Sequence, residues 1–177
     1  MTDIKYFGVL ENMQNNLGLF ELDPLVQTPI NSIKYLSKIA KLDSFHCPAV
    51  VDYLKNVFYI TSPLDFSIIR HPDGMYSIRN DKSVTNDLSS FLYAQYPETK
   101  LLNNVPVLQI HLQYFFINKS DNVMMEVIDC PLISKNYTVV PGTYNISKWV
   151  RPTNFTFFMN KDVKEINFKQ GDPLYAV

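Results

Sequence analysis

The strongest constraint on the fold is the alternation of apolar and polar residues between positions 105 and 117. The polar side chains of this segment are separated by apolar ones: Gln109, His111 and Gln113 lie between Leu108, Ile110, Leu112, Tyr114 and Phe116. Successive side chains of a β-strand point to opposite faces, so a period of two gives one buried face and one polar face. The segment therefore predicts a long strand that covers a core on one side.

Shorter β-rich segments surround this strand and are separated by turn residues. The chain has 12 Phe and 11 Tyr against one Trp, and aromatic side chains suit a half-buried pleated surface. Turn signals at intervals of about eight to twelve residues are typical of sandwiches and small barrels. We predict a mainly β protein, a jelly-roll-like antiparallel β-sandwich, in which 123–129 runs back against 105–117. The other expected strands are 5–10, 57–60, 64–70, 76–79, 137–140, 144–150, 155–159, 164–168 and 174–177.

Helical signals are confined to three places. Apolar residues recur at intervals of three from Ile30 to Ile39, which predicts a helix over 28–41. A second short helix is expected to begin at Pro48, because proline is favoured at the first helical position. A third is expected over 87–94. A length of 177 residues fits a single domain, with 1–56 as an irregular arm plus helical flank and 57–177 as the sandwich.

Composition argues against several functional classes. The net charge of −1 provides no field that would attract nucleic acid or an anionic membrane surface. The chain has only five glycines and no G-x-G-x-x-G or G-K-[ST] string, so nucleotide cofactors are not expected. No apolar run approaches the roughly 20 residues of a membrane-spanning helix. The first residues lack the pattern of a signal peptide, and we expect a cytoplasmic protein that is not secreted.

One set of residues raises the possibility of metal chemistry. His71 and Asp73 form an H-x-D pair that, with a distal histidine such as His111, is the ligand pattern of non-haem Fe(II) oxygenases. In that alternative Arg151 would receive a co-substrate carboxylate. However, Pro-Asp-Gly at 72–74 is also a common hairpin turn. We favour the turn and expect neither a metal nor another cofactor.

The two cysteines are interpreted as structural. Cys47 and Cys130 each precede a proline, where the chain must be extended and a small apolar side chain fits. Two cysteines with His46 fall short of the four ligands of a zinc site. Nothing in the pattern supplies the oriented base and oxyanion site that a nucleophilic cysteine requires.

Two surfaces are candidates for binding. If Trp149 and Arg151 lie on one strand they share a face, and Trp and Arg are enriched at the energetic centres of protein interfaces. The simpler alternative is a stack of the Arg151 guanidinium on the indole within the chain. The polar face formed by Gln109, His111 and Gln113 is the second candidate, and it would suit a small molecule or a sugar.

Two stretches carry a resemblance to a known family. One contains Cys-Pro-Ala at 47–49 and Ile-Thr-Ser-Pro-Leu-Asp at 60–65, and the other contains Lys-Trp-Val-Arg-Pro at 148–152 and Phe-Lys-Gln-Gly-Asp-Pro-Leu-Tyr-Ala-Val at 168–177. Together they resemble an uncharacterised family of proteins from tailed phages of marine bacteria, including cyanobacteria, whose members continue past the last of these residues. The resemblance implies a viral source, and it carries no active site to transfer.

These observations combine into one functional expectation. We expect a non-enzymatic viral protein that acts through protein–protein contacts, with a protein partner or another copy of itself. It would be a component of the virus particle or a factor that binds a host protein in the host cytoplasm. The alternatives are a small Fe(II)-dependent oxygenase and a β-sandwich that binds a small molecule or a sugar.

Overall fold

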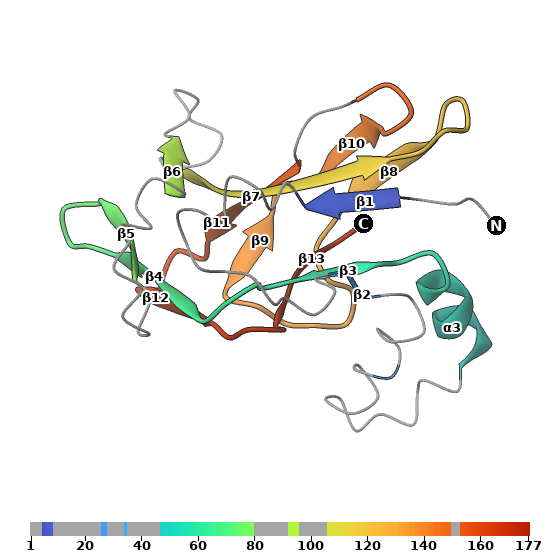
Figure 1. The fold of residues 1–177 in the computed structure, drawn as a ribbon. Coiled ribbons are helices and arrows are strands. Elements are labelled where there is room, and N and C mark those ends of the chain that lie inside the picture. The colour runs from blue at the N-terminus through green and yellow to red at the C-terminus, as the bar shows by residue number, and fades with distance from the viewer. Residues whose placement is uncertain are drawn as a thin grey trace.

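The structure is a computed structural model whose described part is built almost entirely from antiparallel β-strands (Figure 1). It describes residues 5–8, 26–27, 34, 47–79, 92–95, 106–149 and 153–177. The strands form two layers that enclose one principal core, so the mainly β sandwich predicted from the sequence is confirmed. Within the described residues, no helix combines the length and the apolar character needed to cross a bilayer.

The long alternating segment forms the centre of the first layer. Strand β7 (Val107–Ile117) pairs along one edge with β11 (Thr153–Met159), which in turn pairs with β9 (Tyr137–Val139). Its other edge is shared by β6 (Leu92–Gln95), which pairs with the start of β7, and β1 (Lys5–Gly8), which pairs with its end. Both edges of β7 are therefore occupied.

The second layer is built around a long ribbon of two chain segments. In it β3 (Tyr59–Thr61) pairs with β13 (Pro173–Ala176), and β4 (Phe66–Arg70) pairs with β12 (Glu165–Phe168). Between these pairs the chain turns a corner, where the Ser62 N–H donates to the Asp172 carbonyl over 2.8 Å. The register continues on both sides of the corner, which makes the ribbon one bent unit.

Four short strands complete the second layer. β2 (Val26–Gln27) pairs with β3, and β5 (Tyr76–Arg79) pairs with β4. β8 (Met124–Val127) pairs with β10 (Gly142–Asn145), and an isolated bridge from Ile128 to Ala176 joins this pair to β13.

A cluster of aromatic rings fills the space between the layers. Phe155 of β11 stacks on Phe157 with ring centroids 4.3 Å apart and on Tyr175 of the opposite layer at 5.8 Å. Tyr137 of β9 packs against Phe168 of β12 at 5.5 Å. Each buried aromatic ring removes about 150–250 Å² from water, so these contacts provide much of the apolar burial that holds the layers together.

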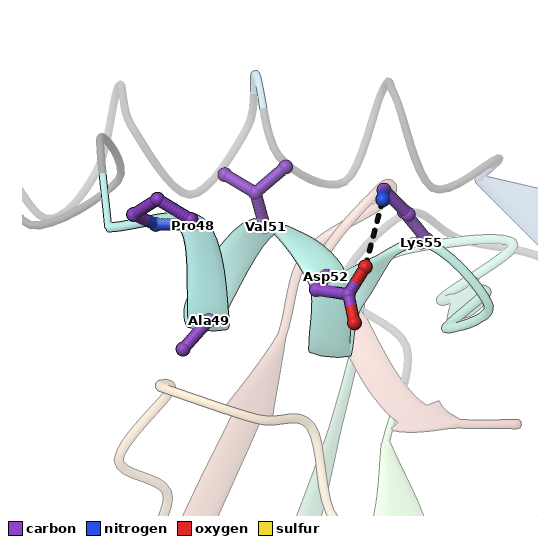
Figure 2. A pocket seen from close by; sticks show the side chains of 5 residues that line it. All are labelled: Pro48, Ala49, Val51, Asp52 and Lys55. Atoms are coloured by element: carbon purple, nitrogen blue, oxygen red, sulfur yellow. Dashed lines mark hydrogen bonds and ion pairs between the residues drawn. The ribbon is translucent and has the colours of Figure 1, made fainter.

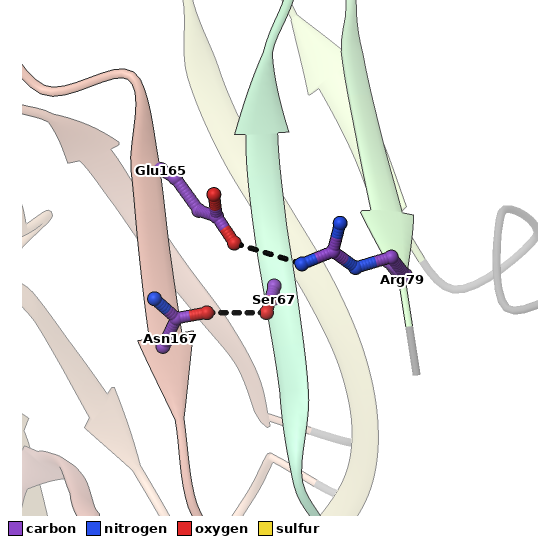
Figure 3. Close-up of polar contacts among 4 residues, drawn as sticks. All are labelled: Ser67, Arg79, Glu165 and Asn167. Carbon is purple, nitrogen blue, oxygen red and sulfur yellow. Dashed lines mark hydrogen bonds and ion pairs between the residues drawn. The ribbon is translucent and has the colours of Figure 1, made fainter. Parts of the chain in front are cut away.

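The outer side of the β12–β4–β5 sheet is linked by polar contacts (Figure 3). Arg79 of β5 reaches across β4 to Glu165 of β12, with Nη2 and Oε1 3.0 Å apart. Beside this pair the Ser67 hydroxyl donates to the Asn167 side-chain oxygen over 2.5 Å. Both contacts join residues about one hundred positions apart in the sequence and help to fix the order of the three strands.

The helix expected to begin at Pro48 is confirmed as α3 (Pro48–Leu54). Pro48 occupies the start of the helix, Cys47 is extended before it, and Leu54 is its buried residue. The helix predicted over 28–41 falls outside the described residues, with the exception of Lys34, which is helical.

Two sequence predictions about the strands are wrong. The helix expected over 87–94 is replaced in its described part by strand β6, because residues 92–95 pair with β7. The segment 123–129 does not run back against β7; β8 pairs with β10 instead. The reason is topological: β11 pairs with 108–114 on one edge of β7, and β6 and β1 pair with 107–110 and 114–117 on the other, so most of both edges is already taken.

Candidate protein-binding site at Trp149

Trp149 lies in a turn that follows β10 and not on a strand, which corrects the sequence prediction. β10 ends at Asn145, whose carbonyl accepts the N–H groups of Lys148 and Trp149 over 3.0 and 2.8 Å. The Asn145 side chain also accepts the Ser147 N–H at 3.1 Å, and such local bonds favour a turn over a continuing strand. Arg151, the other half of the predicted pair, lies outside the described residues.

The indole of Trp149 is half-exposed and packs against another aromatic ring. It is 40% exposed, and its ring packs against that of Tyr144 with centroids 5.8 Å apart and planes tilted by 57°. Gly142 leaves room for this support, because a Cβ atom there would lie 3.1 Å from the Tyr144 hydroxyl oxygen. The absence of a side chain at position 142 therefore helps to position the Tyr144 ring, against which Trp149 packs.

Hydrogen bonds to a neighbouring loop hold the turn in place. The Ser147 hydroxyl donates to the Ser120 carbonyl and accepts the Val123 N–H, the latter over 3.0 Å. The Asn118 N–H donates to the Ile146 carbonyl over 3.2 Å, and both of these residues are buried. Because the turn is fixed before any partner arrives, little ordering entropy would be lost when Trp149 is covered.

Two of the three residues of the predicted polar face of β7 can be placed. Gln109 and His111 are half-buried on the side of the strand opposite the buried Leu108 and Ile110. The side chain of Gln113 lies outside the described part of the chain. Next to this face the register between β11 and β7 is irregular, and the buried Oδ1 of Asn154 has no hydrogen-bond partner among the described residues.

The three candidate iron ligands are not brought together. The His71 ring bonds the Ser77 hydroxyl, with Nε2 and Oγ 2.8 Å apart, and the Asp73 carboxylate accepts the Met75 N–H over 2.9 Å. Gly74 has a φ of +86°, a conformation that glycine adopts without strain, so 72–74 is the predicted turn. His111 lies on β7, and among the described residues no group of three His, Cys, Asp or Glu side chains has the arrangement of a metal site.

A half-buried cluster around Lys135 was not predicted from the sequence. Its Nζ donates to Cys130 Sγ over 2.9 Å and to the carbonyls of Pro173 and Leu174 over 2.7 and 2.8 Å, and it lies 4.9 Å from the centre of the Tyr137 ring. Burial lowers the pKa of Lys135, and burial raises the pKa of Cys130. No sequence pattern marks this cluster, because its carbonyls come from a strand 38 and 39 residues away.

An open hollow lies along α3 and is shown in Figure 2. Its two charged lining residues neutralise each other, since Lys55 Nζ lies 2.7 Å from Asp52 Oδ1, and the pair lowers the pKa of Asp52. Both side chains are exposed, so this pair contributes little to stability. Cys47, directly before the helix, is exposed and not paired in a disulfide. The remaining lining residues are Pro48, Ala49 and Val51.

Comparisons with protein-family models, with curated proteins and with solved structures found no match for this chain. The functional conclusion therefore rests on the geometry of the described side chains. Of the surfaces above, Trp149 combines exposure, an aromatic support and a hydrogen-bonded turn.

Proposed function

We propose that this chain is a phage protein that works without catalysis, by contact with another protein through Trp149. It would act as a component of the virus particle or as a factor that binds a host protein in the host cytoplasm. The observation that carries the proposal is the half-exposed indole, which rests on Tyr144 and is held by a hydrogen-bonded turn. Tryptophan is the residue type most enriched among the side chains that dominate binding energy.

A second set of contacts supports a role in binding over one in catalysis. The side chains that a catalytic site would use already hold the fold: Asp73 accepts a backbone N–H within its own hairpin, and His71 bonds Ser77. Lys135 donates to a thiol and two carbonyls of neighbouring segments. These groups are engaged in holding the fold, and Trp149 is the candidate binding residue that is 40% exposed.

The protein composition of the virus particle decides whether the protein acts as a particle component or as a factor in the host cell. Peptide mass spectrometry on purified particles of the source phage would give the copy number of this chain relative to the major capsid protein. A constant number of copies per particle would identify a structural component. Absence from the particles, with abundance in infected cells, would identify a host-directed factor.

The contact itself is tested by Trp149→Ala. We expect the variant to lose at least tenfold in affinity for its partner, since truncating a central interface residue costs about 2 kcal/mol or more. Folding should be retained, because the indole is outside the principal core cluster. Met75→Ala is the matched control: Met75 is 61% exposed, but it lies in the β4–β5 hairpin, away from β8 and β10 (Figure 1). Equal loss in both variants, or in neither, would contradict the proposal.

A further inference from the structure

We infer that Cys130 and Lys135 form a covalent sulfur–nitrogen cross-link when the folded protein meets hydrogen peroxide. The sulfur and the nitrogen lie 2.9 Å apart, within one short loop between β8 and β9. The inference is independent of the function proposed for Trp149, because the two groups of residues share no described contact.

The geometry directs the reactive electron pair of the amine at the sulfur. The Pro173 and Leu174 carbonyls accept two of the Lys135 N–H bonds, at 2.7 and 2.8 Å, and the third direction points to Cys130 Sγ. Nζ donates an N–H to the sulfur in this arrangement, and when that proton is lost the amine keeps its two N–H bonds to the carbonyls while the lone pair left behind faces the sulfur. Burial favours the neutral form of both groups, because it lowers the pKa of Lys135 and raises the pKa of Cys130.

The thiol lies beneath a loop that is itself at the surface. Cys130 is only 3% exposed, but the loop that follows it contains exposed Leu132 and Ser134. Burial of the thiol keeps the thiolate population low and makes the first oxidation slow. Hydrogen peroxide is a small neutral molecule, and a slow oxidation requires only occasional access to the thiol.

The chemistry balances with one equivalent of peroxide. The thiol is oxidised to a sulfenic acid while the O–O bond breaks and one water leaves: R–SH + HOOH → R–SOH + H₂O. The amine then attacks the sulfur, the S–O bond breaks, and the hydroxyl leaves with an amine proton as a second water: R–SOH + H₂N–R′ → R–S–NH–R′ + H₂O. Sulfenic acids undergo the same condensation with backbone nitrogen. A dithiol reductant reverses the link.

The test uses a background in which Cys130 is the single thiol. The chain has two cysteines, so Cys47→Ser leaves only the buried one. After treatment of the folded protein with hydrogen peroxide, we expect an intact mass lower by two hydrogens, loss of tryptic cleavage after Lys135, and recovery of both by dithiothreitol. Lys135→Arg in the same background keeps the positive charge but removes the primary amine, and it should give only sulfur oxidation.

Four results would overturn the inference. The first is a mass increase of one or more oxygens without loss of cleavage after Lys135, which means sulfur oxidation alone. The second is the same product from Lys135→Arg. The third is an equal yield of cross-link when the protein is unfolded in urea before treatment, since the reaction would then not depend on the folded geometry. An increase of one oxygen less two hydrogens, with cleavage lost, would show an oxygen-bridged link and contradict the direct bond.

Discussion

At the scale of single residues, Lys135 and Tyr137 satisfy a defect in the C-terminal strand. β13 has one residue more than β3 between Pro173 and Tyr175, so the regular pairing is interrupted at Leu174. That carbonyl accepts both the Lys135 ammonium and the Tyr137 hydroxyl, each over 2.8 Å. A carbonyl removed from water without a partner is costly, which explains why a lysine lies half-buried at this position.

We expect Lys135→Met to lower the free energy of unfolding by about 1–3 kcal/mol, because it removes the bonds to the Pro173 and Leu174 carbonyls at 2.7 and 2.8 Å. Urea unfolding followed by circular dichroism measures the change. Lys119→Met is the control, since Lys119 is exposed in the loop after β7 and should change stability by less than about 0.5 kcal/mol. Equal stability of wild type and Lys135→Met would show that the buried bonds contribute nothing.

The buried tyrosines make the free energy of unfolding decrease at alkaline pH. Burial raises the pKa of Tyr59, Tyr137 and Tyr175 far above the ordinary value of 10.0. Their stabilising contribution is complete below about pH 10, and it is lost as the pH rises further, because the unfolded chain then releases protons that the folded chain keeps. Each should contribute a slope of up to about 1.4 kcal/mol per pH unit.

Urea unfolding at a series of pH values above about 10 measures this slope. Lys135, whose pKa is lowered by burial, acts in the opposite sense: its destabilising contribution diminishes as the pH approaches the unfolded value of 10.5. Tyr137→Phe should make the alkaline decline shallower by up to about 1.4 kcal/mol per pH unit. An unchanged slope in that variant would mean that Tyr137 ionises normally in the folded protein.

At the scale of elements, local sequence patterns predicted the positions of the strands well. They predicted poorly which strands pair with one another. The expected strand 76–79 is β5 itself, and 164–168 contains β12, because alternation or β-branched runs are properties of one segment. Pairing depends on which edges are already occupied, and this is a property of the whole sheet. That is why the pairing of β8 with β10 and the contacts of Lys135 with β13 were not predicted.

The loop between β8 and β9 contains a conformation that its residue disfavours. Leu132 has a φ of +64°, in the left-handed region, and its side chain is 56% exposed. Asparagine tolerates this region better, and little packing is lost by removing an exposed leucine. We expect Leu132→Asn to raise the free energy of unfolding by about 0.5–1 kcal/mol in a urea titration. A clear loss of stability would show that the leucine side chain is needed where it lies.

At the scale of the whole molecule, the sandwich presents Trp149 at the end of β10 on a fixed turn. The aromatic core and the bent ribbon hold the two layers together. The loop after β7 fixes the turn through its hydrogen bonds with Ser147. The presence of a candidate tryptophan was predictable from the sequence. Its support by Tyr144 and by the neighbouring loop was not, because those contacts cross from one hairpin to another.

The most direct test is site-specific photo-cross-linking from position 148. Lys148 is exposed and adjacent to Trp149, and a photoreactive amino acid in its place samples the proposed contact. The same replacement at Lys161, exposed in the turn after β11, is the control. Under the proposed function, we expect one protein to be captured in infected cells from position 148 but not from 161, and the yield to fall at least tenfold with Trp149→Ala. Equal yields with and without the indole would contradict binding through Trp149.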